Sequence, residues 1–367
     1  MITSLNKILK KKTNQVFFIA EIGKNYIQNK NSNSVKSAIE NVKKLIIAAK
    51  NSGADAVKLQ THVVGDEIYN INFKSPHFNS LDRYNWVKLN EFLTPLNEFY
   101  IEINEYCKQN NIILFSTPMS KLAAKKISKL NPKLWKLGSG DIKDYLMLDY
   151  ICKKNRPLII STGMVGYKEL DQVYKFIKSY NVNPIIFYCI SKYPCPPKEF
   201  NLSSILRLKN IYPSSTIGFS DHSIIGHESV AAAVSFGAEI IEKHFSFSRS
   251  YWGSDHKSSI TPKEFEKMVK FIKSKQYLDY DYAKYYGQYN LELEGMKNQF
   301  KPFFEKTLVA NKKIQKGKKI TINDLNAMRP KFALKGIPSD QLFSVIGKYA
   351  RKDIFEKSII KKDMIYD

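Results

Sequence analysis

The chain has 367 residues, a formal net charge of +24 and a hydrophobic content of 43%. Its length allows one large domain and a small one, or two to three ordinary domains. Its apolar content is ample for a core, which excludes an intrinsically disordered protein. The longest apolar runs have the length of a strand, so a membrane-spanning helix is not expected either.

Charge and cysteine usage narrow the class of protein further. The four cysteines form no CxxC pair, and residues 1–14 are polar and basic without the apolar core of a secretory signal. We therefore expect a cytoplasmic protein with reduced thiols. The lysines are scattered along the chain and no nucleic-acid-binding motif is present, so no specific nucleic-acid partner is expected. A basic field would instead attract a small anionic substrate.

Apolar strand segments alternate with segments of helical periodicity from residue 15 to about residue 275. Strands are predicted at 15–23, 56–60, 112–115, 134–137, 157–160, 184–188, 216–220 and 239–245. Helices are predicted at 35–51, 96–109, 121–130, 145–153, 169–179, 202–211, 227–236 and from 261 past 272. The polar and aromatic stretch 61–90 breaks this rhythm and is predicted to be a long functional loop.

Repeats of strand and helix give parallel strands with right-handed crossovers, and eight such repeats close a (β/α)₈ TIM barrel. An open doubly wound sheet is the alternative, but no GxGxxG follows the first strand, so a dinucleotide site is not supported. We assign residues 1–275 to the barrel and 276–300, rich in tyrosine and charge, to a linker. Short β and turn signals at close spacing make 301–367 a small β-rich domain.

Two histidines follow neighbouring strands of the predicted barrel. His222 comes just after the strand at 216–220, and His244 lies near the end of the next strand. Because neighbouring strands of a parallel barrel end on one face, the two imidazoles are expected to converge there. Such a pair is a candidate binding site for a divalent metal. Two histidines satisfied in polar loops are the plainer alternative.

Two lysines, Lys58 and Lys136, interrupt otherwise apolar strands. A lysine in such a place points either outward among the helices or into the barrel mouth. Hydroxyls and glycines lie at or just after the ends of three strands, at Gly138-Ser139-Gly140, Ser161-Thr162-Gly163 and Gly218-Phe219-Ser220. Glycine lets backbone N–H groups approach a phosphate, while serine and lysine add donors and charge. The pattern therefore predicts a site for a small phosphorylated compound beside the histidine pair.

Segments along nearly the whole chain resemble the sialic acid synthase family. The matching segments include Ile19-Ala20-Glu21-Ile22-Gly23-Lys24-Asn25, Ala56-Val57-Lys58-Leu59-Gln60-Thr61, Lys136-Leu137-Gly138-Ser139-Gly140-Asp141, Gly218-Phe219-Ser220-Asp221-His222, Glu242-Lys243-His244-Phe245 and Gly253-Ser254-Asp255-His256. The small domain is similar to the antifreeze-like (SAF) module of that family, with Arg329-Pro330 and Ile346-Gly347-Lys348 in place.

The resemblance implies condensation of phosphoenolpyruvate with an N-acylhexosamine, by default N-acetylmannosamine, to a nine-carbon sugar acid. It implies that His222 and His244 bind Mn²⁺ or Mg²⁺, and Glu21 would then assist proton transfer. The residues implied to hold phosphoenolpyruvate are Lys58, Thr117, Lys136, Ser139, Ser161, Ser191 and Ser220, and those implied to contact the sugar are Tyr193, Glu242 and Asp255. Arg329 is implied to reach over the barrel of a second subunit in a domain-swapped homodimer.

The chain departs from the family pattern at Tyr26, Asp141, Tyr188, Ile190 and Lys331. We expect these positions near the sugar or near the small domain, which the resemblance implies is a lid over the barrel mouth. The acceptor therefore stays open among N-acetylmannosamine, its 6-phosphate and the precursors of legionaminic or pseudaminic acid. Three other functions stay open as well: another phosphoenolpyruvate-condensing synthase of 3-deoxy-sugar acids, a Schiff-base aldolase using Lys58 or Lys136, and a basic nucleic-acid-binding or scaffold protein.

Overall fold

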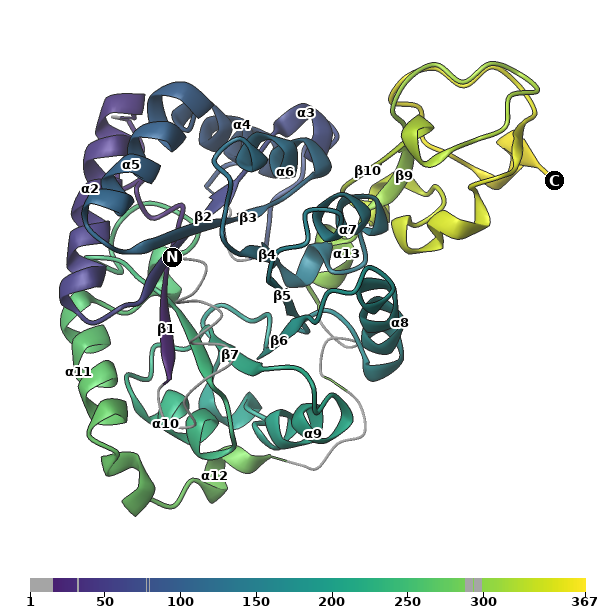
Figure 1. Ribbon diagram of the computed structural model, residues 1–367. Coiled ribbons are helices and arrows are strands. Elements are labelled where there is room, and N and C mark those ends of the chain that lie inside the picture. Colours follow the sequence, from purple (N-terminus) through teal and green to yellow (C-terminus); the bar gives the residue numbers. More distant parts are fainter. Residues whose placement is uncertain (1–15, 32, 77, 79, 288–292, 294–298) are drawn as a thin grey trace.

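The computed structural model describes residues 16–31, 33–76, 78, 80–287, 293 and 299–367. The interpretation of residues 1–14 lies outside the described residues, as does part of the predicted linker at 276–300. Figure 1 shows a barrel surrounded by helices, with the small carboxy-terminal domain beside α7. The boundaries 1–275 and 301–367 stay a prediction.

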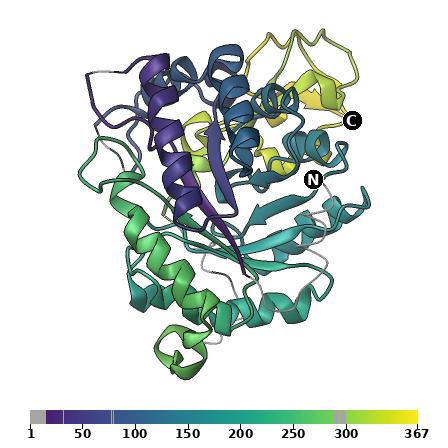
Figure 2. The same ribbon diagram turned by 60° about the vertical axis from the view of Figure 1, so that its left-hand side comes forward.

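Eight parallel strands form one sheet that curls into a barrel (Figures 1 and 2). They are β1 (Phe17–Gly23), β2 (Ala56–Thr61), β3 (Ile113–Pro118), β4 (Trp135–Leu137), β5 (Leu158–Ser161), β6 (Ile185–Cys189), β7 (Ile217–Asp221) and β8 (Ile240–His244). Hydrogen-bonded neighbours follow the order β3-β2-β1-β8-β7-β6-β5-β4, and β3 and β4 lie side by side to complete the ring. The predicted (β/α)₈ barrel is confirmed.

Helices cover the outside of the barrel. They are α2 (Val35–Asn51), α5 (Ile101–Gln109), α6 (Lys121–Ser128), α7 (Tyr145–Cys152), α8 (Tyr167–Lys178), α9 (Ser203–Ile211), α10 (Glu228–Ser235), α11 (Pro262–Lys273) and the short α12 (Ala283–Tyr286). Ser34 caps α2, and Thr261 caps α11 through a capping box with Glu264. A π-helical turn at Leu96–Tyr100 precedes α5, so the single helix predicted at 96–109 has two parts.

The stretch 61–90 is not the continuous loop that its composition predicted. It contains α3 (Val64–Glu67), and α4 (Arg83–Leu93) begins inside it. Asp82 caps α4 by accepting a hydrogen bond from the backbone N–H of Asn85. Trp86 and Leu93 bury the apolar face of this helix. Its asparagines and aromatic residues obscure the helical period.

The small domain is built from short antiparallel pairs. Its strands are β9 (Thr307–Ala310), β10 (Leu325–Met328), β11 (Tyr349–Ala350) and β12 (Ile365–Tyr366), and its helices include α13 (Lys301–Phe304) and α14 (Lys331–Leu334). The backbone of Arg329, just after β10, exchanges hydrogen bonds with Glu67 and Tyr69 of the barrel domain. This pairing places Arg329 at the barrel mouth.

No helix among the described residues has the length and apolar character that crossing a membrane requires.

Candidate active site

A cavity of about 110 Å³ opens at the carboxyl ends of the barrel strands. The predicted site residues that line it are Glu21, Lys58, Thr117, Lys136, Ser139, Ser161, Tyr193, Ser220, His222, Glu242, His244, Asp255 and Arg329. Ser191, the remaining predicted residue, is buried beside the cavity. Its hydroxyl and that of Ser139, which lines the cavity, both lie close to Gly163, where a Cβ atom would collide with them. The strand ends thus bring the predicted residues together on one rim, as expected for a parallel barrel.

Four charged groups alternate in sign across the cavity. Lys58 Nζ lies 2.6 Å from Glu21 and 3.6 Å from Glu242, and Lys136 Nζ lies 3.3 Å from Glu242. All four side chains are buried, so neither lysine points outward among the helices. Opposite charges at this spacing offset the cost of removing each group from water.

The two carboxyls of this cluster differ in acidity. Burial raises the pKa of Glu21 to about 7, with Lys58 opposing the rise and Glu242 adding to it. Burial also acts on Glu242, but Lys136 and Lys58 hold its pKa at about 2. Glu242 is therefore a stable anion, whereas Glu21 exchanges a proton near neutral pH.

Hydroxyl groups line the cavity beside this charged cluster. Lys58 Nζ donates to Thr117 Oγ1 at 3.2 Å, and Ser220 Oγ donates to Glu242 at 3.1 Å. Ser139 Oγ accepts from the backbone N–H of Gly163 at 3.2 Å, an approach that a side chain on Gly163 would block. Such a small, donor-rich and cationic cradle suits a phosphate or carboxylate.

His222 and His244 converge with ring centroids 5.5 Å apart. His222 Nδ1 donates to the carbonyl of Ile190 at 2.7 Å, which assigns its proton to Nδ1 and leaves Nε2 as the electron-pair donor. His244 Nδ1 is buried without a hydrogen-bond partner among the described residues. Burial lowers the pKa of His222 to about 3 and of His244 to about 4. Both are thus neutral imidazoles, so the pair fits a divalent metal ion.

Three further predicted residues line the same cavity. The ring centroid of Tyr193 lies 4.2 Å from that of His222, Asp255 lies 3.7 Å from Lys24 Nζ, and Arg329 pairs with Asp141. In this single chain Arg329 reaches the mouth of its own barrel rather than that of a second subunit. Exchange of the small domain between subunits therefore stays a prediction.

Lys24, Arg83 and Phe304 also line the cavity and were not predicted, and Gln60 was given no role. Gln60 Nε2 donates to Glu21 at 2.8 Å, and Lys24 Nζ donates to Gln60 at 2.9 Å. Strand alternation signals Gln60, since it lies two residues after Lys58 on β2. Arg83 comes from α4 and Phe304 from the short α13, two helices outside the strand repeat, where no sequence signal marks them.

The departures from the family pattern lie in different places. Of the five, only Asp141 lines the cavity. Tyr26, Tyr188 and Ile190 belong to the hydrophobic core, so they bear on the acceptor only indirectly. Lys331 lies in the small domain and pairs with Glu305 at 2.9 Å.

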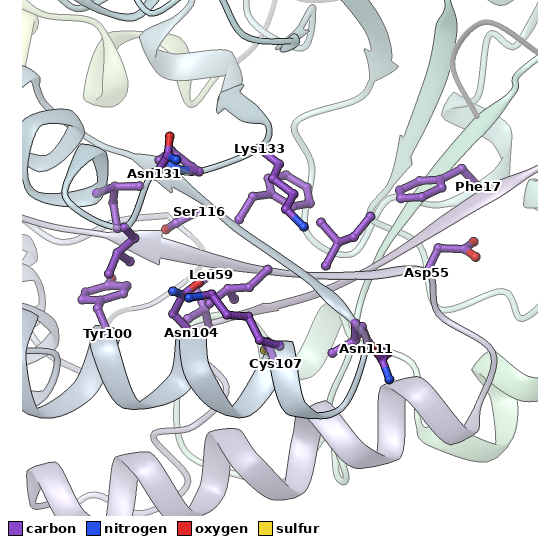
Figure 3. A pocket seen from close by; sticks show the side chains of 18 residues that line it. Phe17, Asp55, Leu59, Tyr100, Asn104, Cys107, Asn111, Ser116, Asn131 and Lys133 are labelled. Carbon is purple, nitrogen blue, oxygen red and sulfur yellow. The ribbon is translucent and has the colours of Figure 1, made fainter. Parts of the chain in front are cut away.

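A larger cavity, of about 250 Å³, lies on the outer side of β3 against α5 (Figure 3). Among the described residues, neither a histidine nor a predicted site residue lines it. Cys107, labelled in the figure, is buried there, and burial raises the pKa of its thiol to about 12, so it is not a reactive nucleophile. Size alone therefore does not mark the active site.

Three acidic residues, Glu169, Glu305 and Asp340, also gather where the small domain meets the barrel. Lys143 Nζ lies 2.6 to 2.8 Å from all three, so an ion-pair network accounts for the cluster.

Comparisons with family models and with individual proteins point to the same family. A model of the NeuB family matches residues 45–281, and a model of the SAF domain matches residues 305–365. The chain is 27% identical to N-acetylneuraminate-9-phosphate synthase of Homo sapiens over 95% of this chain and 92% of that protein. It is 30% identical to pseudaminic acid synthase of Campylobacter jejuni over 93% of this chain and 94% of that protein.

A crystal structure of the spore coat polysaccharide biosynthesis protein SpsE of Bacillus subtilis aligns with a TM-score of 0.77 at 27% identity, covering 97% of this chain and 96% of that chain. The NeuB match spans more than half of the chain and includes Lys58, Lys136, His222 and His244. The chain therefore belongs to the NeuB family, as an enzyme that resembles the sialic acid-type synthases and carries a SAF domain after its barrel.

Proposed function

We propose that this protein condenses phosphoenolpyruvate with an N-acylated hexose and water to a nine-carbon sialic acid-type sugar acid and phosphate. The observation that carries the proposal is one cavity in which two buried lysines stand beside Glu21, His222 and His244. The relatives named as sialic and pseudaminic acid synthases support the same class of reaction.

Phosphoenolpyruvate binds the cationic cradle. Lys58 and Lys136 supply charge, and the hydroxyls of Thr117, Ser139, Ser161, Ser191 and Ser220 supply donors. Because these groups are fixed before the reaction, they stabilise the charge that grows on the departing phosphate. Phosphate leaves by cleavage of the C–O bond, after water has added to the carbon that bears it.

Glu21 carries the proton between the two halves of the reaction. It gives a proton to the aldehyde oxygen when the enol carbon attacks, and it takes one back from the water that adds. His222 and His244 would hold Mn²⁺ or Mg²⁺, which supplies Lewis-acid polarisation of the sugar aldehyde when bound.

The acceptor sugar contacts Tyr193, Glu242, Asp255 and Arg329 in this proposal. The small domain acts as a lid, and we propose that two copies exchange it in a domain-swapped homodimer located in the cytoplasm.

The test is phosphate release from phosphoenolpyruvate across a panel of N-acylhexosamines, with the mass of each product. Release should require phosphoenolpyruvate, an acceptor and a divalent metal, should stop on chelation and should return with Mn²⁺ or Mg²⁺. Release that ignores the acceptor, the chelator or the substitution His244→Ala would overturn the proposal.

Three measurements separate the other functions. Simple aldoses in the panel identify another phosphoenolpyruvate-condensing synthase by the mass of its product. Borohydride trapping with substrate identifies a Schiff base on Lys58 or Lys136. A nucleic-acid-binding protein would show affinity that falls steeply with salt and does not depend on the cavity residues.

A further inference from the structure

We propose that Arg83, together with Lys24, forms a subsite for a negatively charged substituent of the acceptor sugar, a phosphate ester or a carboxylate. The inference rests on the condensation proposed above and names the chemical class of its second substrate.

Arg83 reaches the cavity from α4, the helix that the composition of residues 61–90 did not predict. It is the first residue of α4, and the cap at Asp82 fixes where that helix begins. Its residue is 4% exposed and lines the cavity. The guanidinium carbon of Arg83 lies 5.0 Å from the ring centroid of Phe304 in α13, which is a cation–π contact.

The guanidinium of Arg83 donates no hydrogen bond to any residue that the structure describes. Its ion-pair partner, Glu67 Oε1, lies 3.7 Å away, beyond hydrogen-bonding distance, and the other oxygen of that carboxylate bonds His62 at 2.7 Å. A guanidinium carries five N–H donors, and each of them needs a hydrogen-bond acceptor. In a cavity wall, a bound molecule is the natural source of those acceptors.

Two more cations share this wall. The guanidinium carbon of Arg329 lies 5.7 Å from the centroid of the same Phe304 ring. Its Nε and Nη1 have no hydrogen-bond partner among the described residues. Lys24 lies 3.7 Å from Asp255. Burial lowers the pKa of both Lys24 and Arg83; Asp255 and Glu67 respectively oppose this most, and neighbouring cations add to it. An oxyanion offers these buried cations acceptors, and the planar guanidinium fork matches it in a bidentate way.

The first substrate does not supply this oxyanion. Lys58, Lys136 and the hydroxyl groups already form a cradle for phosphoenolpyruvate, and both lysines pair with Glu242 rather than with the carboxylates beside Arg83 and Lys24. Arg83 instead stands with Lys24 and Arg329, the residue that the small domain brings over the mouth. The second substrate of the proposed reaction is the acceptor sugar, so we assign the negatively charged group that Arg83 binds to that sugar.

The experiment compares three acceptors that differ only at the last carbon: N-acetylmannosamine, its 6-phosphate and the corresponding uronic acid. Steady-state kinetics are measured for wild type, Arg83→Gln, Arg83→Lys and Arg249→Gln. Arg249 pairs with Glu264 outside the cavity, so its variant controls for the loss of one positive charge. Melting curves establish that each variant is folded.

We expect wild type to favour one of the two charged acceptors over the neutral one by about tenfold or more in kcat/KM. Arg83→Gln should remove this preference through the KM of the acceptor, with the KM of phosphoenolpyruvate unchanged, and Arg83→Lys should restore part of it. The favoured acceptor tells a phosphate ester from a carboxylate. Preference of wild type for the neutral sugar, or an equal loss for all three acceptors in Arg83→Gln, overturns the proposal.

Failure of the proposed condensation can be told apart from failure of the proposed subsite. If wild type releases no phosphate with any acceptor, calorimetric titration with N-acetylmannosamine 6-phosphate and with the uronic acid still measures the subsite. Weaker binding of a charged sugar to Arg83→Gln than to wild type and Arg249→Gln supports the subsite, and equal affinities overturn it.

Discussion

Glu21 lies on β1, where strand pairing sets it opposite Lys58 on β2 and His244 on β8. Its buried carboxyl accepts a hydrogen bond from Gln60 and lies 2.6 Å from Lys58 Nζ. Because burial raises its pKa to about 7, this carboxyl holds and releases a proton near neutral pH, which the ionised Glu242 does not. The two glutamates therefore have separate tasks in one cavity.

Glu21→Gln should keep the fold and the binding of phosphoenolpyruvate but lower kcat by about 10²- to 10⁴-fold, the usual range for losing a general acid–base. The amide keeps the size of the side chain and cannot carry the proton. Steady-state kinetics and calorimetric titration with phosphoenolpyruvate measure the two effects separately. Glu169→Gln, at the contact with the small domain, serves as the control. A kcat within about twofold of wild type would exclude the role given to Glu21.

Lys243 has a structural role, although it stands between Glu242 and His244. Strand alternation turns it to the other face of β8. There its fully buried Nζ lies 2.6 Å from Asp221 and donates to the carbonyl of Ser223 at 2.8 Å.

Lys243→Met should lower the free energy of unfolding by about 3–5 kcal/mol, because it leaves the Asp221 carboxylate buried without its counter-ion. Chemical denaturation measures the loss. Adding Asp221→Asn should recover part of it, since the second change removes the unpaired charge. A loss below about 1 kcal/mol would mean that water or a rearranged hydroxyl replaces the lysine.

At the scale of elements, the barrel could be predicted because each strand is a short apolar run followed by a helical period. Parallel strands end on one face, so Lys58, Lys136, His222 and His244 could be placed together without coordinates. Arg83 could not, because it reaches the cavity from α4, inside a stretch whose composition is that of a loop. Arg329 needed the resemblance, since only packing of the small domain brings it to the mouth.

A capping turn organises the small domain. Asp324 ends a 3₁₀ turn at Ile322–Asp324 and accepts hydrogen bonds from Thr321 N at 2.9 Å, Thr321 Oγ1 at 2.6 Å and Lys318 Nζ at 2.8 Å. Burial opposes the effect, but these hydrogen bonds hold the pKa of Asp324 well below its ordinary value of 3.8. The ionised carboxylate therefore stabilises the fold above that ordinary value, and the contribution is lost as pH falls toward the folded pKa.

Asp324→Asn should destabilise the protein by about 1–2 kcal/mol at pH 7, the range for a cap with charge-assisted hydrogen bonds. The difference from wild type should stay constant down to about pH 5 and shrink below the ordinary pKa, because only wild type gains a proton there. Denaturation at a series of pH values measures it. A difference that does not change with pH would show that geometry, rather than charge, carries the stabilisation.

The whole molecule depends on how the small domain covers a barrel mouth. Lys306 lies 2.7 Å from Asp141 and 2.9 Å from Asp144, and Arg329 also pairs with Asp141. These contacts join the two domains of one chain here, and identical copies would form the same contacts after exchange. The resemblance to sialic acid synthases favours exchange, so we expect each active site of the dimer to be shared.

Complementation between two inactive variants decides this arrangement. Lys136→Met damages the barrel and Arg329→Ala damages the lid, and a mixed dimer is obtained by co-expression with two affinity tags. If lids are exchanged, one site of the mixed dimer combines both defects while the other combines an intact barrel with an intact lid. The mixed dimer should then show about half of wild-type activity, although each parent shows little. If each lid covers its own barrel, both sites carry one defect, and the mixed dimer is no more active than its parents.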